Sequence, residues 1–308
     1  MEACYPIIEL DPEQVEAVEW MGTKDKFWVS VPDDDEKWLF KYARESDGAV
    51  VGEHWAEKIA AEIAELMGLP HSLVELARFN GRPGSLSRRF TELSLPGTAL
   101  AHGNVLLASL VWNYDPRKRF GQKDHTLINI LRVVDKMFTE ADDRQRALHH
   151  LMGYLVLDAL ILNTDRHHEN WALIRYTSST GSEQGHRMAP TFDHASSMGR
   201  NVTPTQLAAW AAKPVAVARY ARNAPGAIYA SNTDKQGLNP IELVRLALRV
   251  KPEPMLPWLQ RLRTLDPEAL AAIVGRVPSE MMSPAQQTFT AALLKHTLSI
   301  LQQLYANE

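Results

Sequence analysis

The sequence is almost free of cysteine and contains no long hydrophobic run. Cys4 is the one cysteine in 308 residues, which excludes an intrachain disulfide framework and any metal site built on paired cysteines. The longest apolar stretch, residues 151–162, is interrupted by Asp158 and is too short to cross a bilayer. No basic segment followed by an apolar one opens the chain. We therefore expect no signal peptide, no membrane contact and a cytoplasmic location.

Strong charge of either sign is also lacking. The formal net charge is −4, which gives no reason to expect direct binding to nucleic acid or to an anionic membrane. The patterns GxxxxGK[ST], GxGxxG, HExxH and GxSxG do not occur. Their absence argues against a P-loop NTPase, a Rossmann dehydrogenase, a zincin and an α/β-hydrolase. A hydrophobic content of 45% nevertheless suffices for a large core.

The first part of the chain has the pattern of a small sheet with one helix. Residues 26–31 (KFWVSV) and 37–43 (KWLFKYA) alternate apolar and polar, which predicts a hairpin with Lys41 on the opposite face from Phe40. Residues 52–70 (GEHWAEKIAAEIAELMGLP) have apolar residues at helical spacing, followed by a capping glycine and a proline. Two further strands are predicted at SLVELARF and GSLSRRF.

From about Thr91 onward the pattern is mainly helical. Residues 144–163 predict a long buried helix, and the segments WALIRY and RMAPTF predict two short strands joined by a polar turn. Further helices are expected to begin near Pro240, Pro257, Pro267 and Pro284. The prediction is an α+β, bilobal, protein-kinase-like fold. Residues 1–92 form a β-rich N-lobe, and residues 93–308 form a larger helical C-lobe.

A dense polar motif, NTDRHHEN, lies between the buried helix and the next strand. Within it Asp165 precedes Asn170 by five residues, and Asp193 follows the second strand. This is the order of a phosphoryl-transfer site: a catalytic aspartate, a metal-binding asparagine and a second metal-binding aspartate. Asp165 would accept the proton of the acceptor hydroxyl. Asn170 and Asp193 would supply oxygen ligands to Mg²⁺, which ATP phosphates and water complete.

A kinase also needs a cation for the nucleotide phosphates. Lys41 lies inside a predicted strand, where such a lysine is found, although a strand lysine more often faces solvent. A carboxylate on the next helix should hold it, and both Glu57 and Glu53 are candidates. Each of these features is weak alone, but their order along the chain is specific.

These motifs resemble the HipA-like serine/threonine kinase family, in NTDRHHENW and PTFDHASS above all. The segment AEKIAAEIAELMGLP resembles the family's lysine-partner helix, and this alignment favours Glu57 over Glu53. GTKDKFWV resembles the phosphate-covering loop and LSRRFTE the hinge, where backbone from Arg88 to Phe90 would meet adenine. The implied nucleotide-binding residues are Gly22, Thr23, Lys24, Lys41, Arg88 and Phe90.

The resemblance implies transfer of the ATP γ-phosphoryl to a serine or threonine of a protein. It also implies a substrate such as a translation factor or an aminoacyl-tRNA synthetase, an antitoxin partner and a toxin role. In the better-known members a serine ahead of the loop glycine is autophosphorylated. Here Trp20 and Met21 occupy that stretch and Thr23 offers the hydroxyl, so this regulation is not carried over. The motif Asp–Arg–His–x–x–Asn also resembles that of phosphatidylinositol 3/4-kinases. A lipid or small-molecule kinase is therefore the alternative.

Several residues keep more than one interpretation. Asp165 and Asn170 could simply form a helix-terminating turn. Because adjacent side chains diverge, His167 and His168 are not expected to share one metal ion. We assign His167 as a scaffold of the catalytic loop and His168 as solvent-facing. Two interpretations of Arg166 stay open: its side chain pairs with a carboxylate, or it is exposed to solvent. The sequence assigns no role to His194 or to residues 102–104 and 117–123.

Overall fold

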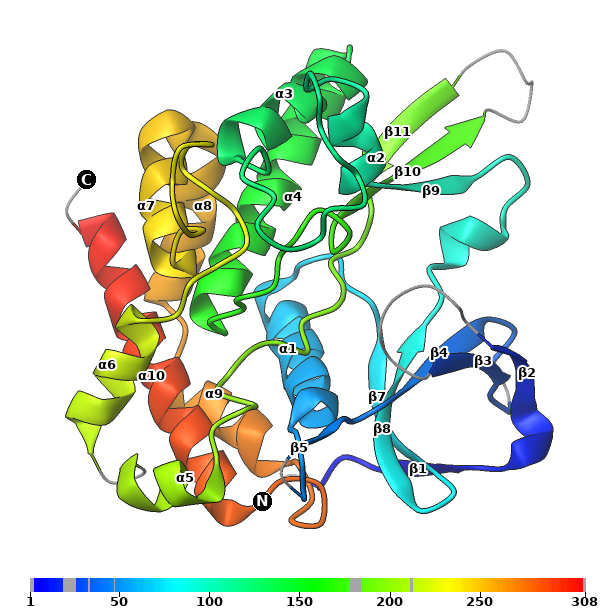
Figure 1. Ribbon diagram of the computed structural model, residues 1–308, viewed down its shortest axis with the longest axis vertical. Helices are drawn as coiled ribbons and strands as arrows, with labels where there is room; N and C mark the ends of the chain where they lie inside the picture. Colours follow the sequence, from blue (N-terminus) through cyan, green and yellow to red (C-terminus); the bar gives the residue numbers. More distant parts are fainter. Residues whose placement is uncertain are drawn as a thin grey trace.

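The computed structural model has a strand-rich N-terminal part and a larger helical part (Figure 1). It describes residues 3–18, 26–32, 34–46, 48–177, 184–210 and 213–306. The N-terminal part is built on a six-stranded sheet in the order β1-β7-β8-β4-β3-β2. Its strands are β1 (Ile7–Leu10), β2 (Val15–Val18), β3 (Lys26–Ser30), β4 (Lys37–Tyr42), β7 (Val74–Phe79) and β8 (Arg82–Arg88). Most neighbouring strands are antiparallel, but β1 runs parallel to β7.

The alternation of apolar and polar residues along the strands decides which side chains lie on each face of this sheet. Phe27 and Phe40 pack on one face, with ring centroids 5.1 Å apart, in a small cluster of their own. Lys41, the neighbour of Phe40, therefore points to the other face, which borders the helical part. The β7–β8 hairpin turns through Asn80 and Gly81, whose φ angles of 51° and 74° suit a two-residue turn.

Helix α1 (Glu53–Met67) joins the two parts of the molecule. It contacts β7 and β8 on one side and α9 (Pro267–Gly275) on the other. Its buried residues, including Trp55 and Ile59, belong to the same hydrophobic cluster as the C-terminal helices. The helix ends at Gly68, which adopts the left-handed conformation (φ 68°) that a capping glycine favours.

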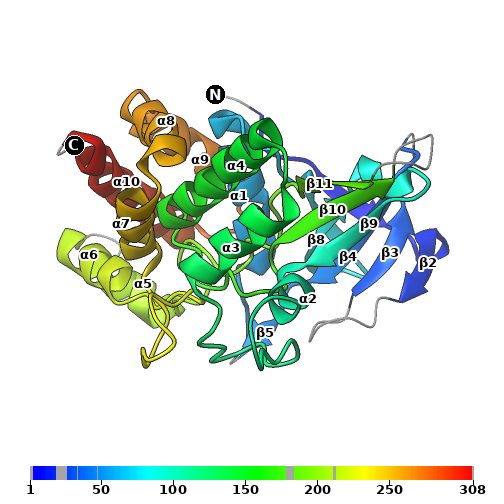
Figure 2. The same ribbon diagram turned by 90° about the horizontal axis from the view of Figure 1, so that it is seen from above.

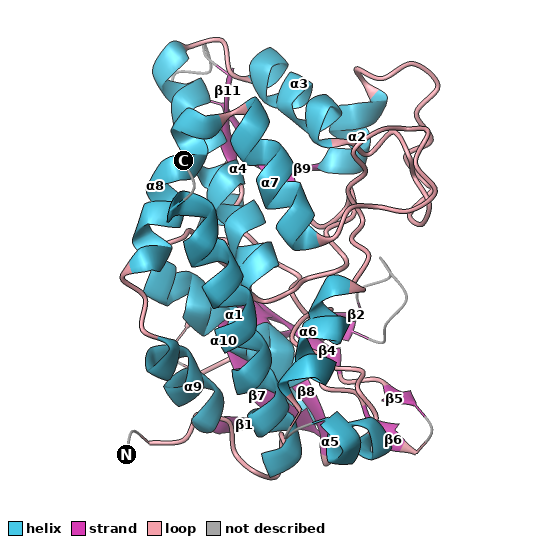
Figure 3. Ribbon diagram, turned by 90° about the vertical axis from the view of Figure 1, so that its left-hand side faces the viewer, coloured by secondary structure: helices cyan, strands magenta, loops and turns pink. Residues whose placement is uncertain are grey.

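Helix α4 (Ala141–Leu160) is the centre of the helical part. It contacts α7 (Pro240–Val250), α8 (Pro252–Arg263) and α10 (Pro284–Ala306), which Figure 3 shows gathered on one side of the molecule. The shorter helices are α2 (Gly103–Ala108), α3 (Leu127–Met137), α5 (Pro204–Trp210) and α6 (Pro214–Arg222). A three-stranded sheet, β9 (Ala99–His102), β10 (Ala172–Thr177) and β11 (Gln184–Met188), lies beside α3 and α4 (Figure 2). Two minor strands, β5 (Glu45–Ser46) and β6 (Ala49–Val50), precede α1.

The predicted fold class is confirmed, but three boundaries differ. Helix α8 begins at Pro252, and Pro257 lies inside it. The buried Met255 and Leu259 hold the helix in the core despite the hydrogen bond that Pro257 cannot make. The predicted strand RMAPTF ends at Met188, and the chain after it forms only a bridge at Thr191. Helix α4 begins at Ala141 and ends at Leu160 rather than spanning 144–163. Among the described residues, no helix is long and apolar enough to span a membrane.

Candidate active site

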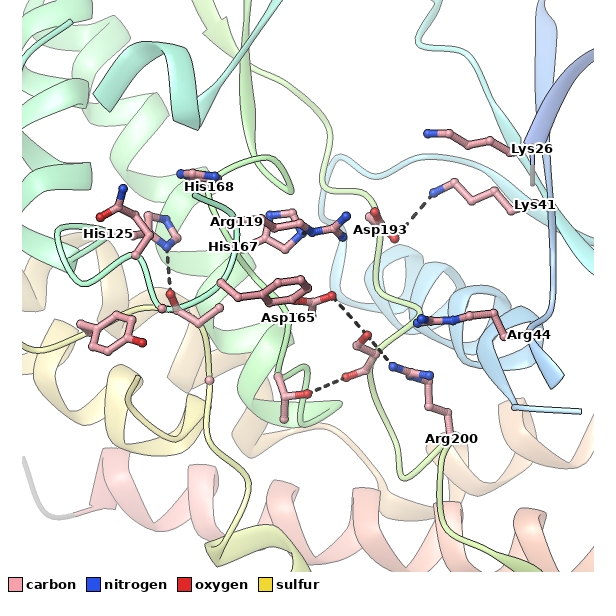
Figure 4. Close-up of a pocket in the computed structure, with 18 residues that line it drawn as sticks. Lys26, Lys41, Arg44, Arg119, His125, Asp165, His167, His168, Asp193 and Arg200 are labelled. Carbon is pink, nitrogen blue, oxygen red and sulfur yellow. Dashed lines mark hydrogen bonds and ion pairs between the residues drawn. The ribbon is translucent and has the colours of Figure 1, made fainter. Parts of the chain in front are cut away.

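Two connected cavities separate the N-terminal sheet from the helical part. The first, about 350 Å³, lies against the sheet and is called here the sheet-side cavity. The second, about 490 Å³, lies over the polar motif after α4 and is called the loop-side cavity. Four side chains line both cavities: Lys26, Lys41, Arg119 and Asp193. Of the predicted site residues, Lys41, Asp165, His167 and Asp193 line the loop-side cavity (Figure 4), whereas Glu57 and Asn170 line neither cavity.

The polar motif is shaped by its own hydrogen bonds. Leu162 takes a positive φ of 52° as the chain leaves α4, and the Asn163 amide N–H donates to the Asp158 carbonyl at 2.8 Å. The Asn170 side chain donates to the Asp165 carbonyl at 2.8 Å. The five-residue spacing therefore closes a loop that fixes Asp165 and Asn170 relative to each other. The Asp165 carboxylate lines the loop-side cavity.

Arg166 is buried and ties this loop to two other segments. Its guanidinium makes two 2.7 Å bonds to the carboxylate of Asp158 on α4. It also donates to the Asn170 carbonyl and, at 3.0 Å, to the Phe192 carbonyl just before Asp193. The reading of Arg166 as exposed is wrong, and the reading as a paired residue is confirmed. The sequence signal was Asp158, a carboxylate in the otherwise apolar stretch 151–162, which requires a buried partner.

Asp193 sits in a constrained stretch of backbone. Its φ of 57° is in the left-handed region, which is uncommon for a residue other than glycine. Its carboxylate oxygen lies 3.6 Å from the Lys41 ammonium nitrogen across the two cavities. The arrangement therefore joins strand β4 to the segment that Arg166 holds.

Lys41 and Glu57 are close enough to influence each other's protonation. Burial disfavours the charged ammonium, but the carboxylates of Asp193 and then Glu57 outweigh burial and raise the pKa of Lys41. Burial alone would also raise the pKa of Glu57. Hydrogen bonding from His194 and the charge of Lys41 instead hold that pKa below its ordinary value. Both side chains are therefore charged at neutral pH. Lys41 forms its ion pair with Asp193, and among the described residues it forms none with Glu57.

His194, whose role the sequence left open, holds Glu57. Its backbone N–H donates to Glu57 Oε1 at 3.0 Å, and its ring nitrogen Nδ1 lies 3.7 Å from the same oxygen. Glu57 Oε2 is buried and has no hydrogen-bond partner among the described residues. One oxygen of Glu57 is thus anchored to the segment after Asp193, while the other remains available for a further donor.

The two histidines of the motif are both buried. His168 is 1% exposed and bonds through Nδ1 to the Tyr114 hydroxyl at 2.7 Å, so the expectation of a solvent-facing His168 is wrong. Its side chain does diverge from His167, but the chain before α3 covers that side. His167 Nε2 accepts from Arg119 Nε at 2.9 Å. Burial and then the charge of Arg119 lower the pKa of His167 to about 3, so its imidazole is neutral at pH 7, and its role as a scaffold stays a prediction.

The segments 102–104 and 117–123 also belong to this region. His102 Nδ1 bonds to the Glu169 carbonyl at 2.8 Å, and the Asn104 N–H donates to the His168 carbonyl at 2.9 Å. These contacts brace the polar motif from the side of α2. Arg119, from the basic stretch, lines both cavities rather than facing solvent.

The predicted nucleotide-binding residues fall into two groups. Arg88 and Phe90 line the sheet-side cavity, and the Phe90 ring lies 5.8 Å from that of Phe192. The Arg88 backbone N–H donates to Leu73, its carbonyl accepts from Ser72, and its guanidinium pairs with Asp34. The remaining predicted residues, Gly22, Thr23 and Lys24, lie outside the described residues.

The oxygen donors present are of the kind that Mg²⁺ binds. Asp193 offers a carboxylate beside the cavities, and Asn170 offers an amide carbonyl on the braced loop. Mg²⁺ takes few protein ligands and fills the rest of its octahedron with phosphate oxygens and water. Among the described residues, no group of three or more His, Cys, Asp or Glu side chains forms a metal cluster.

Comparisons with known proteins agree with this fold. Over its full length the chain resembles the crystal structure of a Helicobacter pylori proinflammatory kinase, CtkA. The TM-score is 0.75 and the identity 17%, with 98% of this chain and 99% of that chain covered. It also resembles HipA of the Shewanella oneidensis toxin–antitoxin system, solved with HipB and operator DNA. That TM-score is 0.57 and the identity 13%, with 97% and 67% of the two chains covered.

No curated protein matches the chain. The model of the HipA-like C-terminal domain, however, matches residues 18–248, which is most of the sequence. At these low identities the two structures establish the fold, and the family model establishes the relationship. The chain therefore belongs to the HipA-like C-terminal domain family, and its fold is that of a HipA-like kinase.

Proposed function

We propose that the protein transfers the γ-phosphoryl of ATP to a serine or threonine hydroxyl of a protein. The observation that carries this proposal is the convergence of the Lys41–Asp193 ion pair with the Asp165–Asn170 loop around two connected cavities. A turn that only ends helix α4 does not explain this loop, because Arg166 also binds the loop to the segment before Asp193.

Asp165 is the group that accepts the proton. As the acceptor oxygen forms its bond to the γ-phosphorus, its proton passes to the Asp165 carboxylate, and the bond from phosphorus to the β-bridging oxygen breaks. ADP takes up that electron pair and leaves. His167, which is neutral and bonded to Arg119, keeps the loop in place and carries no proton in the reaction.

Asn170 and Asp193 would hold Mg²⁺, which neutralises charge on the β- and γ-phosphates when it is bound. Lys41 would contact the phosphates, and the unpartnered oxygen of Glu57 would hold Lys41 when it leaves Asp193 for the nucleotide. The phosphates would be covered by Gly22, Thr23 and Lys24, which precede β3 in the sequence.

The sheet-side cavity would hold the adenine. Phe90, Phe192 and Leu39 provide its apolar walls. The Arg88 N–H and carbonyl, the Arg89 N–H and the Phe90 carbonyl are already bonded within the protein. The adenine contacts of the hinge would therefore come from the Arg89 carbonyl and the Phe90 N–H. We place the boundary between the lobes at residues 92 and 93, just after this hinge.

The partners of the Shewanella protein suggest those of this one. That protein was solved with HipB and operator DNA, so we propose a small antitoxin-like partner here, with a toxin role for the kinase. The phosphorylated protein would be a cytoplasmic component such as a translation factor or an aminoacyl-tRNA synthetase. Direct contact of this chain with nucleic acid or membrane is not part of the proposal.

Incubation of the purified protein with γ-labelled ATP, Mg²⁺ and a cytosolic extract tests this function. We expect label on discrete proteins, and a loss of about 10²- to 10⁴-fold in Asp165→Asn with ATP binding retained. Asp115→Asn, on an exposed loop, is the matched control. Full transfer by Asp165→Asn would exclude the mechanism. Label on added lipid vesicles, with none on proteins, would replace it with lipid phosphorylation.

A further inference from the structure

A third hollow continues the loop-side cavity away from the sheet. It measures about 350 Å³ and shares Thr164, Ser196 and Arg200 with the loop-side cavity. Its far wall is formed by Trp210 at the end of α5 and by Arg219 and Tyr220 on α6. We call this hollow the outer groove. Together the two hollows form a path that starts at Asp165 and leads to the surface of the helical part.

The outer groove is positively charged although the chain is negative overall. Its charged lining residues are Arg200 and Arg219, and no carboxylate lines it among the residues that the structure describes. The chain as a whole carries a net charge of −4. Arg219 is exposed, and no described residue forms an ion pair with it. The groove therefore presents a cation that the protein itself does not neutralise.

Excess positive charge continues at the junction with the loop-side cavity. Arg44 and Arg200 both pair with the single carboxylate of Glu53, at 2.7 Å and 3.0 Å. Glu53 is only 3% exposed, whereas the side chain of Arg44 is 51% exposed. The carboxylates of Asp165 and Asp193 also attract Arg44. Among the described residues, however, these two carboxylates share the lining of the loop-side cavity with five cations, Lys26, Lys41, Arg44, Arg119 and Arg200. Each guanidinium has five N–H donors to share. The junction can thus accept a further anion.

These arginines do not belong to the nucleotide side of the site. Lys26 and Lys41 line the sheet-side cavity, but Arg44, Arg200 and Arg219 do not. Figure 4 shows Lys26 and Lys41 above Asp193, and Arg44 and Arg200 below it. The lysines account for the charge of ATP. The arginines instead face whatever approaches Asp165 from the opposite side, which is the molecule that carries the acceptor hydroxyl.

The distance from Asp165 to the first of these arginines sets the position of the anion. The Arg200 guanidinium donates to the Ser196 hydroxyl at 3.0 Å, and that hydroxyl lies 3.4 Å from the Asp165 carboxylate. An extended chain advances about 3.3–3.6 Å per residue. A carboxylate on Arg200 would therefore lie about one to three residues from a hydroxyl at Asp165. One on Arg219 would lie farther along the same segment.

We propose that the acceptor is an acidic polypeptide segment, in which the phosphorylated serine or threonine is followed or preceded by glutamate or aspartate within about three residues. This inference rests on the proposed kinase function and specifies its substrate class. Arg200 binds the nearer carboxylate and Arg219 the farther one, and Trp210 and Tyr220 border the segment.

Two matched peptides test this proposal. Both contain one central serine, flanked by glutamates in the first and by glutamines in the second. Binding to the full-length protein is measured by fluorescence anisotropy, and phosphorylation is measured separately with γ-labelled ATP. We expect the glutamate peptide to bind about three- to tenfold more tightly, with a smaller difference at high salt because exposed ion pairs are screened.

Arg219→Glu should abolish or reverse this preference. Arg222→Glu makes the same charge change on the same helix outside the outer groove, and should retain the preference of the unaltered protein. Equal affinity for both peptides, or equal effects of the two substitutions, would overturn the proposal. The glutamate peptide could bind through Arg219 while no peptide is phosphorylated. This result would support the acidic segment and would contradict only the proposed kinase function.

Discussion

The two sides of the candidate site differ in how their charged residues are held. On the side of the helical part, Arg166 binds Asp158, the Asn170 carbonyl and the Phe192 carbonyl at once. On the side of the sheet, Lys41 has a 3.6 Å ion pair with Asp193, and one oxygen of Glu57 has no partner among the described residues. The loop that would perform the chemistry is preorganised, whereas the lysine that would bind phosphate can exchange one carboxylate for another.

This difference follows from the way each side is built. The loop residues are within a few positions of α4, a helix buried in the main core, so short-range hydrogen bonds fix them. Lys41 stands on a strand whose opposite face packs in a small separate cluster. A lysine there can change partners without disturbing the main core. Catalysis by positioning requires a rigid acceptor side, and nucleotide binding and release require an adaptable one.

The largest effect is expected from breaking the rigid side. Arg166→Met removes the partner of a buried carboxylate, which costs about 3–5 kcal/mol of unfolding free energy, and it frees the Phe192 carbonyl that positions Asp193. Chemical denaturation measures the loss.

A second substitution separates stability from positioning. Asp158→Asn added to Arg166→Met removes the unpaired charge, so we expect much of the stability to return while phosphoryl transfer stays low. Transfer at the normal rate in this double variant would show that Arg166 has no part in aligning the two loops.

The contrast between the two sides also separates what the sequence predicts from what it does not. Strand alternation placed Lys41 on the cavity face, and five-residue spacing brought Asp165 and Asn170 together, because both patterns are local. The roles of His168 and residues 102–104 depend on contacts with Tyr114 and with the polar motif, far away in the chain. Local pattern carries no information on which distant segment covers a side chain, so these residues were misassigned or left open.

A smaller effect is expected on the adaptable side. Glu57→Gln keeps an oxygen that can accept from the His194 N–H, so the fold should be retained. The substitution removes a negative charge that raises the pKa of Lys41, and it weakens the hold on this lysine after nucleotide binds. We expect kcat/KM for ATP to fall about tenfold, or roughly 1.4 kcal/mol, as measured in steady-state kinetics.

Glu62→Gln is the matched control for this prediction. Glu62 lies on the same helix and pairs with Lys58, away from both cavities. Equal losses in the two variants would mean that Glu57 acts only through the stability of α1.

The smallest effect concerns acid stability of the rigid side. His125 donates from Nδ1 to the Ala227 carbonyl at 2.9 Å and accepts at Nε2 from the Trp171 N–H at 3.1 Å, so it must be neutral. Burial lowers its pKa to about 3, against about 6.5 in an unfolded chain. Between these values the unfolded state binds more protons. The contribution of His125 to stability is therefore complete above about pH 6.5 and declines as the pH falls toward 3.

Thermal unfolding measured from pH 7 to pH 5.5 tests this contribution. Over this range the free energy of unfolding should fall by about 1 kcal/mol less in His125→Asn than in the unaltered protein. Identical pH slopes would mean that the pKa of His125 is the same in the folded and unfolded states, and would contradict this prediction.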